Sequence, residues 1–220
     1  MNKFLLTFLI IVLISLLGLF FLDRVITFSI NHFSVFEISY DKLKGNILRK
    51  TEIDGLYAET GPDGINVLAK KAVFSLRIKK SFEKKKIMLD CALYGVKFIP
   101  KGKSEKDASQ EENVLAVPFS PQQEYEKITF TIYLDGKALE IFDFKAVSPN
   151  IRMEGGCVSS KNTDNIALNW KISFSPEASK SLPEDVRSGV LSKDENGWYS
   201  TVISYKGNIL MLKALYSLTA

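Results

Sequence analysis

Apolar and polar residues alternate with a period of two through most of the chain after residue 35. The alternation is strictest at 128–134 and 166–174, where every second residue is Ile, Leu, Phe or Trp. Such a long run with a period of two is typical of a strand with one apolar face, because a helix repeats about every 3.6 residues. We therefore expect a mostly β domain of about ten antiparallel strands with one short helix.

Segments rich in Gly, Lys, Asn and Asp separate the alternating runs and predict turns. They are "KLKGN" at 42–46, "GPDG" at 61–64, "KKSFEKKK" at 79–86 and "DGK" at 135–137. The last two elements, at 197–205 and 208–218, are predicted to form a closing hairpin.

The apolar phase slips once inside a predicted strand. Ile87, Leu89, Cys91 and Leu93 lie on one parity, whereas Tyr94, Val96 and Phe98 continue on the other. A β-bulge at Gly95 would explain this slip, because glycine tolerates the backbone conformation that a bulge requires.

Two further segments break the alternation. Residues 101–113, "KGKSEKDASQEEN", contain Ala108 as their only apolar residue and predict a long exposed loop. A linker between two domains is the alternative, but each part would then be short of core. "SLPEDVRSGVL" at 181–191 predicts the short helix, with Ser181 and Glu184 as a capping box and Pro183 in the first turn.

Residues 4–22, "FLLTFLIIVLISLLGLFFL", carry no charge. A helix of this length reaches about 28 Å, close to the hydrocarbon thickness of a bilayer. A cleaved signal peptide is the alternative, but the apolar run is long and no pair of small residues marks a cleavage site. We expect an N-terminal membrane anchor at 1–24, a juxtamembrane link at 25–34 and a β domain at 35–220. The short head before the span favours a cytoplasmic N-terminus and a translocated β domain.

Charge is uneven along the chain, whose formal net charge is +4. Residues 41–103 carry 15 Lys and Arg against 7 Asp and Glu. Lysines on strands usually form a solvated face and discourage edge pairing. The alternative is that this basic part lies near anionic lipid headgroups.

The residues needed for most enzyme chemistry are missing from the sequence. The only histidine, His32, lies beside the predicted membrane surface, and no zinc, calcium or nucleotide-binding motif occurs. We therefore expect no enzyme activity, no metal, no cofactor and no nucleic-acid partner, although two carboxylates could still meet in space. Cys91 and Cys157 could form one disulfide or remain as two buried thiols.

A sheet with one apolar face must pack that face against something, and one short helix is little cover. Two sheets facing each other in a closed sandwich would bury every apolar row. One strongly curved sheet, shaped like a taco shell or jelly roll, would leave an apolar groove open to hydrocarbon chains. The candidate lipid-binding residues of such a groove are Phe74, Leu76, Ile78, Ile87, Leu89, Phe130, Ile132, Trp170, Ile172 and Phe174.

Five short motifs follow the predicted anchor: "GNI" at 45–47, "IDGL" at 53–56, small and apolar residues at 69–76, "KKIML" at 85–89 and "VKF" at 96–98. Their order resembles the N-terminal part of AsmA-like and TamB-like proteins of Gram-negative envelopes, over residues 36–98. The resemblance implies a groove-shaped β domain in the periplasm, held to the bacterial inner membrane and associated with phospholipid or lipopolysaccharide traffic. Residues 114–220 do not contribute to it.

Members of that family that bridge the envelope are several times longer than this chain. In size the chain is similar to the single-pass jelly-roll component of lipopolysaccharide transport and to the N component of type II secretion. We therefore expect a membrane-anchored protein that binds lipid acyl chains near its own membrane, without breaking a bond. The alternative is a scaffold of an envelope or secretion complex that adds a strand from a partner protein to an open sheet edge.

Overall fold

Eleven strands form one antiparallel sheet in the computed structural model, which describes residues 37–46, 50–59, 65–100, 117–134, 138–160 and 165–208. The strands are β1 Glu37–Ser39, β2 Lys42–Asn46, β3 Lys50–Glu59, β4 Ile65–Leu76, β5 Ile87–Pro100, β6 Glu124–Leu134, β7 Ala138–Val147, β8 Ile151–Ser160, β9 Asn165–Phe174, β10 Ser192–Lys193 and β11 Tyr199–Asn208. The helices are α3 Ile78–Lys84 and α4 Glu184–Gly189, with the short 3-10 helices η2 Val117–Phe119 and η3 Ala178–Ser181.

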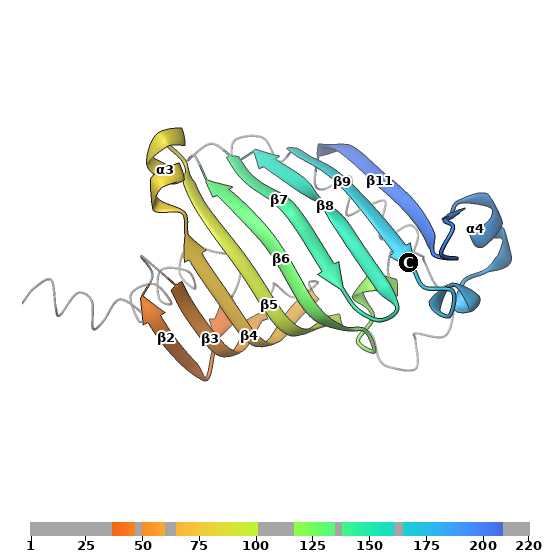
Figure 1. Cartoon of the computed structure of the whole chain (residues 1–220), viewed down its shortest axis with the longest axis horizontal. Helices are drawn as coiled ribbons and strands as arrows, with labels where there is room; N and C mark the ends of the chain where they lie inside the picture. The colour runs from red at the N-terminus through yellow and green to blue at the C-terminus, as the bar shows by residue number, and fades with distance from the viewer. Residues whose placement is uncertain are drawn as a thin grey trace, which may run out of the picture.

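Neighbouring strands follow one another almost in chain order, β1-β3-β4-β5-β6-β7-β8-β9-β11-β10, and β2 also pairs with β3. Within the described ranges the two ends of this order do not pair, so the sheet is open (Figure 1). The prediction of a mostly β, antiparallel fold with few helices is confirmed. The described strands do not divide into the two facing sheets of a sandwich.

The apolar slip predicted at Gly95 crosses four neighbouring strands. Ala69 and Ala72 of β4 are both fully buried, and the two lysines between them, Lys70 and Lys71, pair with carboxylates instead. The ladder skips one residue in each strand and then resumes in the same register. The skipped residues are Gly55, Lys70, Gly95 and Glu126. The slip is therefore shared by β3 to β6 rather than confined to one strand. The β-bulge predicted at Gly95 is wrong, because the register does not change there; the described register shifts lie between β6 and β7 and between β7 and β8.

The lysine-rich segment at 79–86, predicted as a turn, is mostly helical. α3 begins at Ile78, which the alternation had assigned to a strand, and it ends before Lys85, whose φ of 53° is left-handed. Ile78 has the parity of the preceding strand residues, but it is also one helical turn from Phe82. Lys and Glu are good helix formers, and here the helical spacing wins over the alternation.

One further prediction about the strands is wrong, and one long strand has no predicted counterpart. "KLKGN" forms the strand β2, which pairs with β3 along its whole length, and is not a turn. Gly45 takes a φ of 101° within this strand. β8 was missed in the sequence, because its central residues are Gly155 and Gly156 and few of its side chains are apolar.

The helix predicted at 181–191 exists as α4, but the predicted capping box does not. Its N-cap is Pro183, which makes no side-chain cap hydrogen bond. The Ser181 hydroxyl donates instead to the Ala178 carbonyl at 2.8 Å. The first arm of the predicted closing hairpin is β11.

Several predicted features lie outside the described residues: the anchor at 1–24, the link at 25–34 with His32, the turn at 61–64, the loop at 101–113 and the second arm of the closing hairpin. Among the helices that the structure does describe, none is long and apolar enough to cross a bilayer.

The shared slip makes Gly95 sensitive to substitution. Its φ is 59°, and an added Cβ would lie 2.6 Å from Lys70 Cδ, although that flexible side chain can move aside. We expect Gly95→Ala to lower the free energy of unfolding by about 1–2 kcal/mol, because the left-handed backbone is strained for alanine. Urea unfolding of the full-length protein measures this change.

Gly189→Ala is the matched control. Gly189 lies in α4, and an added Cβ would meet nothing within 4 Å. Alanine should leave stability unchanged or raise it there. Equal midpoints for the two variants would contradict the assigned role of Gly95.

Candidate functional site

Burial of the apolar face changes steadily along the strands. We call this face, which carries Leu89, Ile132 and Trp170, the inner face. Residues that face one another across β4 to β9 form rows, and the row nearest α3 includes Ile87, Leu134 and Leu139, which are 55%, 38% and 38% exposed. The next row is half-buried, and it contains Leu76, Leu89, Ile132, Ile141, Cys157 and Leu168.

The opposite end of the inner face is closed by the protein itself. Val96, Tyr125 and Phe174 are 0% exposed there. η2 covers this end, where Tyr125 Oη donates to the Pro118 carbonyl at 3.0 Å and Phe119 packs edge-on against Phe98. The cover is completed by residues in and around η3 and α4, namely Ala178, Leu182, Val186 and Leu191.

A row of aromatic rings separates the closed end from the open end. Phe144 of β7 stacks on Trp170 of β9 with ring centroids 5.2 Å apart, and Phe130 of β6 lies 6.3 Å from Phe144. β8 runs between β7 and β9, and it places Gly155 opposite both Phe144 and Trp170. A Cβ on Gly155 would lie 2.7 Å from Trp170 Cδ1, so the glycine makes room for the stack.

A hollow of about 890 Å³ lies at the open end of the inner face, beside α3. Its lining is mainly apolar and comes from β4, α3, β5, β6, β7 and β8: Leu76, Ile78, Ser81, Phe82, Lys85, Lys86, Ile87, Leu134, Ala138, Leu139 and Ser159. Its volume falls within the range of about 300–1,000 Å³ that is usual for ligand sites.

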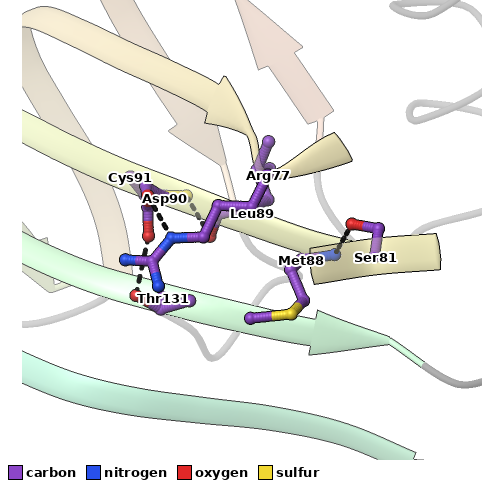
Figure 2. Close-up of polar contacts among 7 residues, drawn as sticks. All are labelled: Arg77, Ser81, Met88, Leu89, Asp90, Cys91 and Thr131. Atoms are coloured by element: carbon purple, nitrogen blue, oxygen red, sulfur yellow. Dashed lines mark hydrogen bonds and ion pairs between the residues drawn. The ribbon is translucent and has the colours of Figure 1, made fainter. Parts of the chain in front are cut away.

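A polar network fixes α3 to the neighbouring strands (Figure 2). Arg77 Nε contacts Asp90 Oδ2 at 2.5 Å, and the Thr131 hydroxyl donates to Asp90 Oδ1 at 2.9 Å. This contact with the Asp90 carboxylate raises the pKa of Arg77. At the other side of the helix, the Met88 amide donates to Ser81 Oγ at 3.0 Å. Contacts with β5 therefore hold both the residue before α3, Arg77, and a residue within the helix, Ser81.

On the face of the sheet opposite the inner face, most lysines of β3 to β6 pair with carboxylates. Glu52 accepts from Lys50 and Lys71 at 2.7 Å each, which lowers its pKa to about 2. Glu124 similarly pairs with Lys70 and Lys97. This arrangement agrees with a solvated face over β3 to β6.

The candidate residues from the sequence fall into three groups. Leu76, Ile78 and Ile87 line the hollow. Leu89, Ile132, Phe74, Phe130 and Trp170 continue from it across half-buried positions of the inner face. Ile172 and Phe174, at 1% and 0% exposure, belong to the closed core and have no free surface for a ligand.

The sequence did not single out several residues that line the hollow. Phe82 lies in a segment whose composition predicts a turn, although its spacing of four from Ile78 is a helical signal. Leu134 and Leu139 belonged to recognised alternating runs, and they face each other across β6 and β7.

Cys91 and Cys157 are both free thiols on the inner face. They lie on β5 and β8, with β6 and β7 between them, which explains why no disulfide forms. Burial raises the pKa of Cys91 to about 12, with a further contribution from the Asp90 charge. Burial also raises the pKa of Cys157, which is less deeply placed.

No family model, curated protein or solved structure matches the chain. Within the described part of the chain, no group of three or more His, Cys, Asp or Glu side chains is placed to hold a metal ion.

The two thiols should react at different rates. At about pH 8.5, near the ordinary thiol pKa, iodoacetamide should label Cys157 several-fold faster than Cys91, because Cys91 is more deeply buried and its thiolate is scarcer. Mass spectrometry of peptides from the folded full-length protein measures both rates. Equal rates would show that β5 is not packed as described. In urea the difference should disappear.

Proposed function

We propose that this protein binds lipid acyl chains on the open half of its inner face. The observation that supports this most directly is the change from fully buried rows at one end to exposed leucines around a hollow at the other. Each CH₂ group that leaves water for such a surface contributes about 0.8 kcal/mol. Binding of this kind requires no catalytic group.

The curvature that would turn the open face into a taco-like or jelly-roll-like groove is part of this proposal. So is the place of the protein, a single-pass anchor in the bacterial inner membrane with the β domain in the periplasm. The resemblance to AsmA-like and TamB-like proteins supports both, and the uncharged segment at 4–22 supports the membrane anchor. The cargo would be phospholipid or lipopolysaccharide, moved in lipid transport or outer-membrane assembly with other envelope proteins as partners.

A scaffold that adds a strand from a partner protein is the second candidate. β10 pairs only with Tyr199 and Ser200 of β11, so within the described ranges one edge of β11 lacks a strand from Thr201 to Gly207. Such an edge can accept a further strand through main-chain hydrogen bonds. A protein partner whose binding is unaffected by changes to the hollow would favour this function.

Replacing leucines of the hollow tests the lipid proposal. Leu134→Asn and Leu139→Asn should each weaken binding of a fluorescent fatty acid about tenfold, because each loses roughly 1.4 kcal/mol of apolar contact. Displacement titration with the purified full-length protein gives the affinity, and native mass spectrometry shows whether co-purified lipid is lost.

Leu68→Asn is the matched control. Leu68 has the same 38% exposure as Leu139, but it lies between Val67 and Ala69 of the core and points to the other face. Its substitution should leave lipid binding unchanged. Unchanged binding in the two hollow variants, or an equal loss in Leu68→Asn, would show that the hollow is not the lipid site.

Cys157 offers a second measurement without substitution. It is half-buried in the row next to the hollow, so a bound chain should protect it. We expect removal of lipid to raise its labelling rate several-fold and added fatty acid to reverse that change. Cys91 is an internal control because it is 3% exposed in any case. A rate for Cys157 that lipid does not alter would place the ligand elsewhere.

A further inference from the structure

α3 presents an apolar pair to solvent at the edge of the hollow. Phe82 is 81% exposed and Ile78 is 39% exposed, and they lie one helical turn apart. Both also line the hollow, so the pair extends the inner face beyond the end of the sheet. Ile87, which is 55% exposed, lines the same hollow. A single exposed apolar residue is ordinary, whereas exposed apolar residues gathered in one place indicate an interaction surface.

Basic side chains surround this pair. Residues 77–86 contain six Lys and Arg and one acidic residue, Glu83. Arg77 and Lys86 pair with Asp90 and Glu140. Within the described residues Lys79, Lys80 and Lys85 have no carboxylate partner, and Lys84 lies over the ring of Tyr133.

Main-chain hydrogen bonds also hold the connection between β4 and β5. The Arg77 amide donates to the Met88 carbonyl at 2.9 Å, and the Lys86 amide donates to the Ser81 carbonyl at 3.1 Å. Together with the Asp90 contacts, these bonds fix the direction of the apolar pair. Ordering Phe82 at another surface would therefore cost little backbone entropy.

We propose that α3 inserts its apolar pair into the headgroup region of an anionic lipid bilayer. Exposed apolar residues flanked by unpaired lysines are the chemistry of segments that lie in a membrane interface. A protein partner is the weaker match, because two side chains are far smaller than the roughly 800 Å² per partner of a stable interface.

Docking at α3 would place the hollow directly beside the bilayer. An acyl chain could then pass from the membrane along Phe82 and Ile78 to Ile87 and the half-buried rows without crossing water. This last step rests on the proposed lipid function, whereas docking of α3 itself does not.

Tryptophan fluorescence in vesicles tests the docking. The full-length Phe82→Trp variant is reconstituted into vesicles of equal amounts of phosphatidylglycerol and brominated phosphatidylcholine, whose bromine atoms quench nearby indoles. We expect several-fold more quenching of the added fluorescence than in the Val190→Trp control. Val190 is 60% exposed and is the C-cap of α4, and α4 lies on the opposite side of the molecule from α3 (Figure 1).

Two additional arms identify the cause of quenching. Adding Lys79→Gln, Lys80→Gln and Lys85→Gln, or replacing phosphatidylglycerol with neutral lipid, should reduce the quenching of the Phe82→Trp variant. Adding Leu139→Asn should leave it unchanged, because quenching would then come from the bilayer and not from a lipid bound in the hollow.

Equal quenching of the Phe82→Trp and Val190→Trp variants would overturn the docking proposal, and so would quenching that ignores lipid charge. Quenching abolished by Leu139→Asn would also overturn it, while supporting a lipid bound in the hollow. Charge-dependent quenching in a protein that binds no fatty acid would support docking and reject the lipid-binding function, so the two failures are distinguishable.

Discussion

The structure depends on an imbalance between one wide apolar sheet face and the few segments able to cover it. Burial of apolar area contributes about 25 cal/mol per Å², so uncovered strand residues represent stabilisation that the described chain leaves unused. η2, η3 and α4 satisfy the end that carries Tyr125 and Phe174. Around Leu134 and Leu139 the described residues provide no comparable cover. The packed core and the proposed binding surface therefore lie at opposite ends of the same strands.

The aromatic row allows these two ends to coexist. Phe130, Phe144 and Trp170 pack against the buried core, and each keeps part of its own surface exposed. Gly155 contributes by its lack of a side chain, since any larger residue would push the indole off Phe144. The row lies between the two ends, so the closed end is packed without any contribution from the exposed leucines of the open end.

Local signals in the sequence were sufficient for the strands but not for their cover. The period of two found β5, β6, β7 and β9, and a single glycine located the slip at Gly95. Ile172 and Leu134 carry the same pattern, yet one is in the core and the other is exposed. The difference comes from segments distant in the chain, such as Val117–Phe119, whose positions no periodicity reveals. Ile78 fitted both a strand and a helix, and β8 gave no signal because glycines occupy its centre.

The slip shared by β3 to β6 has a consequence for how the protein can change during evolution. Loss of one residue from β5 alone would turn the remainder of that strand over, exposing Val96 and burying Lys97 among the core residues. Neighbouring strands would keep their old phase, so no local repair could restore the match. Changes in the lengths of these four strands are therefore coupled, and we expect relatives of this chain to gain or lose residues in all four together or in none.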